Sequence, residues 1–181
     1  MADRDAGRIL PPLTLILSGA RSGKSLLAEG MVAATGKALY LATAEAGDDE
    51  MATRIATHQA RRGPDWRTIE EPLDLAETLS QENREGEAIL IDCLTLWLSN
   101  LMLAGRDVAA ETKALTEAIE GAKAPVVAVS NEVGMGLVPE TKLGRDFRDA
   151  QGILNCRMAE FANKVIFVAA GLPLILKDET T

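Results

Sequence analysis

The stretch Leu13–Leu27 constrains this chain more than any other. Its sequence, LTLILSGARSGKSLL, predicts an apolar strand, a tight glycine-bearing loop and the start of a helix. Within it, Ser18–Ser25 is close to the phosphate-binding pattern G-x-x-x-x-G-K-[ST]. In such a loop, successive backbone N–H groups face one concavity and bind phosphate oxygens, aided by the positive end of the following helix. The sequence therefore predicts a nucleotide-binding loop.

The loop departs from the pattern at its first position, where Ser18 stands in place of glycine and Gly19 follows one residue later. A helix entry that carries Gly-Lys-Ser by chance is the alternative, and the strand–loop–helix context disfavours it. Lys24 is expected to reach the β- and γ-phosphates, and the Ser25 hydroxyl to ligate Mg²⁺. The predicted nucleotide ligands here are Ser18, Gly19, Ala20, Arg21, Ser22, Gly23, Lys24 and Ser25.

Composition limits the classes of function. The 181 residues suit one domain, and 47% apolar with only 3% aromatic residues predicts an aliphatic core. A net charge of −8 argues against a general nucleic-acid binder, which needs a basic face. The two cysteines lack metal-type spacing, so a reducing cytoplasm is the expected setting. We expect neither a secretory signal in residues 1–12 nor a membrane span.

Apolar runs and helical segments alternate along the chain. Strands are predicted at Leu13–Leu17, Ala38–Thr43, Ala88–Asp92, Pro125–Ser130 and Val165–Ala170, with an antiparallel edge strand at Leu172–Lys177. The segment Trp66–Glu70 is predicted to be extended. Helices are predicted at Leu26–Thr35, Asp49–Arg62, Asp74–Asn83, Leu94–Leu103, a segment ending near Lys123, and 142–163. This alternation predicts one α/β domain with a mostly parallel sheet at 13–177, and loose tails at 1–12 and 178–181.

Several carboxylates lie where ligands of open α/β sheets bind, at or just after strand ends. Asp92 ends an apolar strand, which fits a Mg²⁺-holding position; capping the helix at Leu94 is the alternative. The carboxylates of Glu70 and Glu71 are candidates for binding a ribose diol or a guanine edge, although sequence alone favours a solvated acidic pair. Glu132, in the loop after the strand predicted at Pro125–Ser130, is either a kinase base or part of a flexible turn.

Arg145, Arg148 and Asp149 share a helix face downstream. They fit a surface charge cluster, a contact between subunits or an anion site. Trp66 and Trp97 fit core or interface positions better than base-stacking platforms.

His58 is the only histidine in the chain. It shares a helix face with Met51 and Ile55, which is typical of a packed core histidine. However, Arg54, Arg61 and Arg62 lie within four residues of it. Guanidinium groups suit phosphate contacts, and a positive surround keeps imidazole neutral and nucleophilic. From the residues alone, phosphate handling and core packing are equally supported.

Three blocks together resemble a known family: GARSGKS, LYLATAEAGDDEMATRIATHQARRGPDWRTIEEP and NEVGMGLVPETKLGRDFRDAQGILN. They are similar to the bifunctional adenosylcobinamide kinase/adenosylcobinamide-phosphate guanylyltransferase family, from about Leu13 to Lys177. The resemblance implies two activities in cobalamin nucleotide-loop assembly. The first phosphorylates adenosylcobinamide with ATP or GTP. The second transfers GMP from GTP to adenosylcobinamide phosphate through a GMP-histidine intermediate.

The resemblance also implies site residues and an assembly. His58 stands at the matching position in R-I-x-x-H-x-x-R-R, so it would be the guanylylated residue. Besides the loop, the nucleotide site would include Thr43, Ala44, Glu45, Gln59, Ala60, Arg61, Arg62, Glu70 and Asp92. Ser25 and Asp92 would hold Mg²⁺. A P-loop NTPase fold with a RecA-like sheet and a homotrimer are expected by resemblance only.

Two alternatives stay open at this point. One is a guanylyltransferase that has lost the kinase step, because both reactions would use the same phosphate loop. The other is a P-loop ATPase or switch module that binds a protein or nucleic acid. The acidic composition and the arginine-flanked single histidine disfavour this last alternative.

Overall fold

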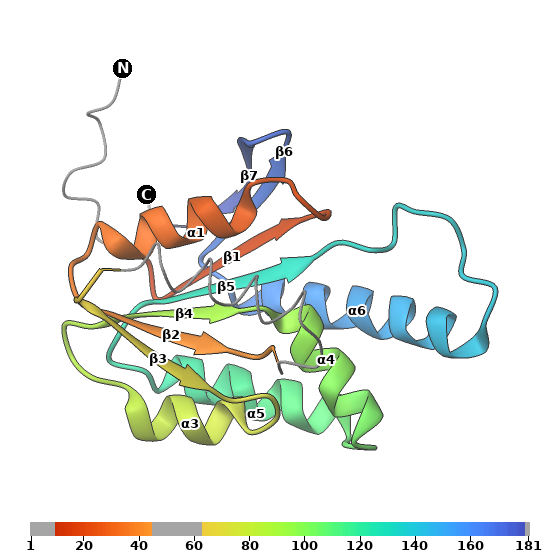
Figure 1. Cartoon of the computed structure of the whole chain (residues 1–181), viewed down its shortest axis with the longest axis horizontal. Coiled ribbons are helices and arrows are strands. Elements are labelled where there is room, and N and C mark those ends of the chain that lie inside the picture. The colour runs from red at the N-terminus through yellow and green to blue at the C-terminus, as the bar shows by residue number, and fades with distance from the viewer. Residues whose placement is uncertain (1–9, 45–62, 180–181) are drawn as a thin grey trace.

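The computed structural model describes residues 10–44 and 63–179. A seven-stranded sheet forms its centre, in the order β3-β2-β4-β5-β1-β6-β7 (Figure 1). All neighbouring strands are parallel except β6 and β7, which are antiparallel. The predicted class, a mostly parallel sheet with an antiparallel C-terminal edge strand, is confirmed. The strands are β1 (Leu13–Ser18), β2 (Ala38–Ala42), β3 (Trp66–Glu70), β4 (Ala88–Asp92), β5 (Val126–Asn131), β6 (Lys164–Ala169) and β7 (Leu172–Asp178).

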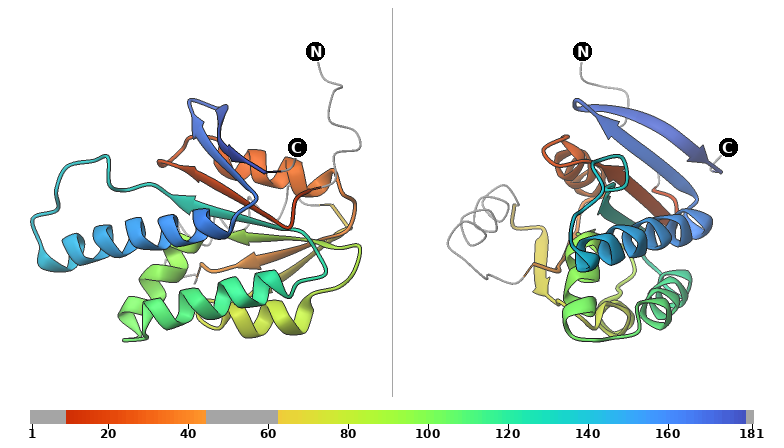
Figure 2. Two further views of the ribbon diagram at one scale, coloured as in Figure 1. Left: turned by 180° about the vertical axis from the view of Figure 1, so that it is seen from behind. Right: turned by 90° about the vertical axis from the view of Figure 1, so that its right-hand side faces the viewer.

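Helices cover both faces of the sheet (Figures 1 and 2). Side chains alternate along β1, so Leu15 packs with the helices of one face and Ile16 with α1 on the other. Both clusters are mostly aliphatic, as the low aromatic content predicts. Among the described residues, the helix on one face is α1 (Lys24–Ala33); those on the other are α3 (Leu75–Glu82), α4 (Leu94–Leu103), α5 (Val108–Glu120) and α6 (Lys142–Phe161). In the described ranges, no helix is long and apolar enough to cross a membrane.

Most predicted elements agree with the structure to within a few residues. Helix α1 begins at Lys24, two residues before the prediction, because the last loop residues already enter the helix. Strand β7 continues to Asp178, where a loose tail was predicted. Asp178 pairs with Lys164 at 2.9 Å, and the Glu179 N–H donates to the Asn163 carbonyl at 2.8 Å, which fixes this end. The helix predicted at Asp49–Arg62 lies entirely outside the described residues.

The tryptophans occupy structural positions, as predicted. Trp97 is fully buried, and its indole N–H donates to the Leu73 carbonyl at 2.8 Å. Trp66 is half-buried and packs edge-on against Tyr40. Neither ring is therefore presented as a platform for a base.

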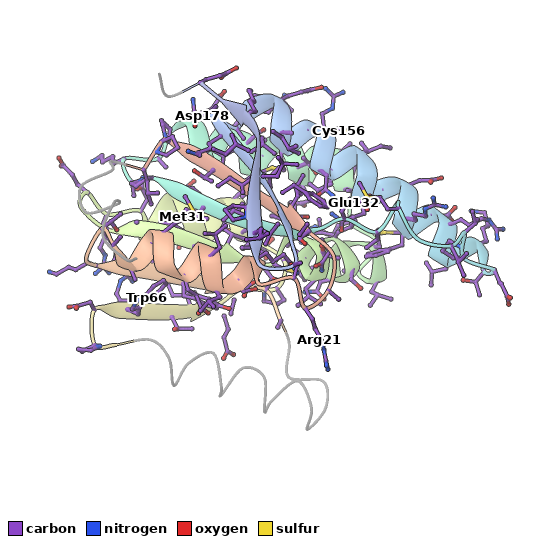
Figure 3. All side chains as sticks on the ribbon, turned by 90° about the horizontal axis from the view of Figure 1, so that it is seen from above. Arg21, Met31, Trp66, Glu132, Cys156 and Asp178 are labelled. Atoms are coloured by element: carbon purple, nitrogen blue, oxygen red, sulfur yellow. The ribbon has the colours of Figure 1, made fainter. Side chains whose placement is uncertain are left out.

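The register brings the carboxyl ends of the parallel strands to one edge of the sheet. Ser18 pairs with Asn131, and Ala42 pairs with both Asp92 and Glu70. Figure 3 shows Arg21 and Glu132 at this end of the molecule, and Met31 and Trp66 toward the other. Residues far apart in the sequence therefore meet where parallel sheets bind ligands.

A charged cluster attaches the outer strand β3 to its neighbours. Arg67 binds Glu87 through two N–H groups, at 2.9 and 2.6 Å, and Glu82 through a third at 2.8 Å. The Glu87 side chain is only 8% exposed. Hydrogen bonds from Arg67 lower the pKa of the Glu87 carboxyl, although burial opposes them. This pair stabilises the strand that carries Glu70.

We predict that Glu87→Gln lowers the free energy of unfolding at pH 7 by about 1–3 kcal/mol, because Arg67 loses a charged partner. The folded pKa of Glu87 lies below its ordinary value of 4.5, so its ionised form stabilises the fold above that pH. This stability is lost as the pH falls through the folded pKa. Urea unfolding from pH 7 to pH 3 should therefore show the two proteins converging at low pH. Glu85→Gln, an exposed change in the same turn, is the control. A difference in free energy of unfolding between wild type and Glu87→Gln that stayed the same at every pH would contradict the prediction.

Candidate functional site

The loop between β1 and α1 is arranged to bind an anion. None of the backbone N–H groups of Gly19–Gly23 donates a hydrogen bond within the part of the chain that the structure describes. Two residues are in the left-handed region, Arg21 at φ 54° and Gly23 at φ 94°. Runs of unpaired N–H groups in such turns form concavities that bind phosphate. The backbone of Gly19–Gly23 thus has the geometry expected of the predicted phosphate loop.

Lys24 is the first residue of α1, and its side chain folds back over this loop. Its Nζ donates to the Gly19 carbonyl at 3.1 Å. The ammonium group and the N-terminus of α1 place positive charge at the same point. Ser25 follows in the first turn and is half-buried. These positions fit the phosphate and metal roles predicted for the two residues.

Ser18, the irregular first position, is used inside the protein. It is 1% exposed, and its hydroxyl donates to the Val168 carbonyl on β6. The hydroxyl is therefore not presented to a ligand. The departure from glycine instead attaches the start of the loop to the neighbouring strand.

Thr43 and Asp92 meet at the adjacent ends of β2 and β4. The buried Thr43 hydroxyl donates to the Cys93 carbonyl and accepts from the Cys93 N–H, both at 2.8 Å. Its backbone N–H donates to the Asp92 carbonyl at 3.2 Å. Thr43 thus lies at the predicted edge, but its hydroxyl acts by joining two strand ends. Ala44 follows it, half-buried.

The Asp92 carboxylate is held in place without capping a helix. Its Oδ2 accepts from the Tyr40 hydroxyl at 2.7 Å. The N-cap of α4 is Cys93, and no side-chain bond caps that helix. The alternative in which Asp92 caps α4 is therefore wrong, and the carboxylate stays oriented at the sheet edge.

Cys93 lies beside Asp92 but is not a suitable nucleophile. Burial, together with the neighbouring Asp92 charge, raises the pKa of its thiol to about 11. The thiol is therefore protonated at neutral pH, whereas attack requires the thiolate.

The acidic pair at the end of β3 divides into two roles. Glu71 accepts hydrogen bonds from the N–H groups of Leu73 and Asp74, at 2.9 and 2.7 Å, and so organises the start of α3. Glu70 is exposed, and its carboxylate makes no hydrogen bond or ion pair among the described residues. Of the two, Glu70 is the one that the described part of the chain leaves unengaged at this edge.

The loop after β5 is a structured turn, not a flexible one. Glu132 accepts from the N–H groups of Gly134 and Met135, at 2.7 and 3.1 Å. Arg148 on α6 donates to the Gly134 carbonyl at 2.6 Å, and Arg145 donates to the carbonyls of Pro139 and Glu140. Both Glu132 oxygens are occupied by this loop, which disfavours it as a base. Because both arginines donate to carbonyls of the loop, the structure does not support an anion site formed by them.

The donor set suits a Mg²⁺ ion that is bound mainly through phosphate and water. Within the described residues, no group of three or more His, Cys, Asp or Glu side chains could hold a metal by itself. Mg²⁺ is commonly held by one or two protein ligands plus substrate phosphates. The Ser25 hydroxyl and the Asp92 carboxylate provide a set of that kind.

The remaining predicted site residues lie outside the described ranges: Glu45, His58, Gln59, Ala60, Arg61 and Arg62. Sequence reasoning also missed a contact, because the Gly171 N–H donates to the Ser22 carbonyl at 2.9 Å. A tight turn was predicted at Gly171, but nothing local to the sequence indicates that this turn meets the phosphate loop.

Sequence comparison gives consistent matches over nearly the whole chain. The profile described as cobinamide kinase / cobinamide phosphate guanyltransferase matches residues 14–176. The bifunctional adenosylcobalamin biosynthesis protein CobP of Pseudomonas aeruginosa is 50% identical, covering 91% of this chain and 97% of the relative. The bifunctional adenosylcobalamin biosynthesis protein CobU of Escherichia coli is 38% identical, covering 91% and 99%.

Solved structures share the fold at low sequence identity. A prototypical ATPase from the type III secretion system of pathogenic bacteria gives a TM-score of 0.55 at 11% identity, covering 92% of this chain and 56% of that one. A protein from Pyrococcus horikoshii OT3 gives 0.51 at 9% identity, covering 92% and 86%. The likeness to the ATPase supports the predicted P-loop NTPase fold.

We predict that Thr43→Val destabilises the protein by about 1–3 kcal/mol, because the buried N–H and C=O of Cys93 both lose their partner. Thr112→Val is the matched control, since that buried hydroxyl donates only to the Val108 carbonyl of its own helix. Urea unfolding of both variants measures the difference. Equal losses would show that the Thr43 bridge has no special structural role.

Proposed function

This chain belongs to the cobinamide kinase / cobinamide phosphate guanyltransferase family, and on that premise we propose that it catalyses two successive reactions. It phosphorylates the aminopropanol hydroxyl of adenosylcobinamide with ATP or GTP. It then transfers GMP from GTP to adenosylcobinamide phosphate, which gives adenosyl-GDP-cobinamide and pyrophosphate. The observation that carries the proposal is the family match over residues 14–176. The matched segment contains a phosphate loop in which the N–H groups of Gly19–Gly23 have no partner among the described residues.

One loop serves both reactions in this proposal. In the kinase step, the N–H groups of Gly19–Gly23 and the Lys24 ammonium hold the β- and γ-phosphates while the γ-phosphoryl group is transferred. In the guanylyl step, the same groups stabilise the charge that develops on the departing pyrophosphate. Mg²⁺, when bound, neutralises phosphate charge, and Ser25 and Asp92 are the side chains that would hold it.

His58 is the nucleophile of the guanylyl step. A nitrogen of the neutral imidazole attacks the α-phosphorus of GTP, the bond to the β-phosphate oxygen breaks, and pyrophosphate leaves. A phosphate oxygen of the corrinoid then attacks the same phosphorus, which breaks the P–N bond and releases neutral His58. Support comes from the sequence, where His58 is the only histidine and lies among Arg54, Arg61 and Arg62. The raised pKa of Cys93 also removes a nearby competing nucleophile.

Glu70 recognises the nucleoside. Its carboxylate lies at the same sheet edge and is not engaged by the described residues. The N1–H and N2–H₂ groups of guanine, or a ribose diol, are suitable donors for it.

The assembly in this proposal is a homotrimer, which light scattering would detect as three times the 19.3 kDa chain mass.

The guanylyl step is tested with α-labelled GTP and Mg²⁺, followed by denaturation and detection of label on the chain. We predict acid-labile, alkali-stable label on the wild-type protein and none on His58→Asn. This lability distinguishes a P–N bond from a phosphate ester. A wild-type protein that takes up no label would contradict the histidine intermediate.

The kinase step is tested separately with γ-labelled ATP and adenosylcobinamide. We predict that Lys24→Ala lowers both activities by about 100-fold or more, because a charged donor to the phosphates is lost. His58→Asn should lose only the guanylyl step and retain phosphorylation. If His58→Asn lost both activities while remaining folded, a role for His58 confined to the guanylyl step would be wrong.

A further inference from the structure

The β6–β7 hairpin contacts the phosphate loop through its turn. Ala170 and Gly171 form this turn with φ 52° and 79°. Figures 1 and 2 show from three directions that the tip of the hairpin lies beside the segment between β1 and α1. Two hydrogen bonds join them: the Gly171 N–H donates to the Ser22 carbonyl at 2.9 Å, and the Ser18 hydroxyl donates to the Val168 carbonyl.

The N–H groups and the carbonyls of the loop differ in their hydrogen bonding. The N–H groups of Gly19–Gly23 are unpaired among the described residues, whereas four carbonyls of the loop accept hydrogen bonds. Three of these bonds come from the residue after β5, from α1 and from the loop lysine: Glu132 N to Ser18, Leu27 N to Gly23, and Lys24 Nζ to Gly19. The fourth, from Gly171 to Ser22, comes from a segment that is far away in the sequence.

The bond to Ser22 fixes the direction of one N–H group. Ser22 and Gly23 are joined by a trans peptide, in which the C=O and the N–H point to opposite sides. With the Ser22 carbonyl directed at the hairpin, the Gly23 N–H is directed away from it. Gly23 is also confined, because a Cβ there would lie 3.4 Å from the Gly171 Cα.

We propose that Gly171 is a positioning residue for phosphate binding: its N–H holds the Ser22–Gly23 peptide so that the Gly23 N–H faces the phosphates. The hairpin thereby acts on the nucleotide without contacting it. This inference rests on the proposed function only in taking the loop as the nucleotide site.

Gly171→Ala and Gly86→Ala form a matched pair for the test. Both glycines have φ 79°, and a Cβ at either meets nothing within 4 Å, so the backbone strain is alike. Gly86 lies before β4, at the opposite edge of the sheet from the loop. Both changes should lower stability similarly, but only Gly171→Ala should displace the N–H that binds Ser22.

Calorimetric titration with magnesium pyrophosphate is the readout. We predict that Gly171→Ala raises its Kd by about tenfold relative to Gly86→Ala, because one charge-assisted hydrogen bond is misdirected. GMP, which lacks the β- and γ-phosphates, should bind the two variants equally. Equal pyrophosphate affinities, or a parallel loss for GMP, would overturn the inference.

An ester substitution keeps the test decisive if Gly171→Ala fails to fold. Two full-length proteins are assembled by ligation at Ala170→Cys, one with the natural amide at Gly171 and one with an ester, which lacks that N–H. The ester protein should bind pyrophosphate about tenfold more weakly, and equal binding would again overturn the inference. If the wild-type protein binds pyrophosphate tightly and the amide and ester proteins bind it equally, only this inference is refuted. A wild-type protein that binds no nucleotide refutes the proposed function.

Discussion

The site depends on how one short loop divides its backbone hydrogen bonds. Carbonyls of the phosphate loop are bonded to the protein, whereas the N–H groups of Gly19–Gly23 have no partner in residues 10–44 and 63–179 and so are left for a ligand. Burying unpaired donors is costly, so they persist where a ligand or water can reach them. The sheet, α1, Lys24 and the β6–β7 hairpin each supply part of this arrangement. The geometry that we propose for phosphate binding therefore depends on the surrounding fold as much as on the sequence of the loop.

The other polar residues at the sheet edge are divided between structure and ligand. Thr43, Glu71 and Glu132 all bond to nearby backbone groups and hold strand ends or turns in place. Asp92 is oriented by Tyr40, and Glu70 is unengaged among the described residues. Residues that looked alike in the sequence thus serve different purposes. Only their hydrogen-bond partners distinguish the carboxylates that shape the edge from those that we propose for ligand binding.

The sequence predicts the fold well because its signals are local. Runs such as Leu13–Leu17 and Ala88–Asp92 are apolar along both faces, which is typical of buried parallel strands. The phosphate loop is equally local, since its pattern lies within eight residues. Because neighbouring strands of the sheet are parallel, their carboxyl ends meet at one edge. The position of Asp92 at that edge was therefore also predictable.

The contacts that sequence reasoning missed join distant segments. The Ser18 hydroxyl bonds to Val168, which is 150 residues away, and Gly171 bonds to Ser22. No periodicity or spacing indicates such pairs, because they depend on which strand lies beside β1. The residues around His58 support phosphate handling and core packing equally. Its role as the guanylylated residue comes from the family resemblance and stays a prediction.

The central claim is that the N–H groups of Gly19–Gly23 bind phosphate. An NMR titration of the ¹⁵N-labelled protein with magnesium pyrophosphate tests it most directly, because each backbone amide gives its own signal. The account predicts that the amide protons of Gly19 and Gly23 shift downfield and saturate together, at one dissociation constant. If those signals stayed in place while amides elsewhere shifted, the phosphate would bind at another site, and the account would be wrong.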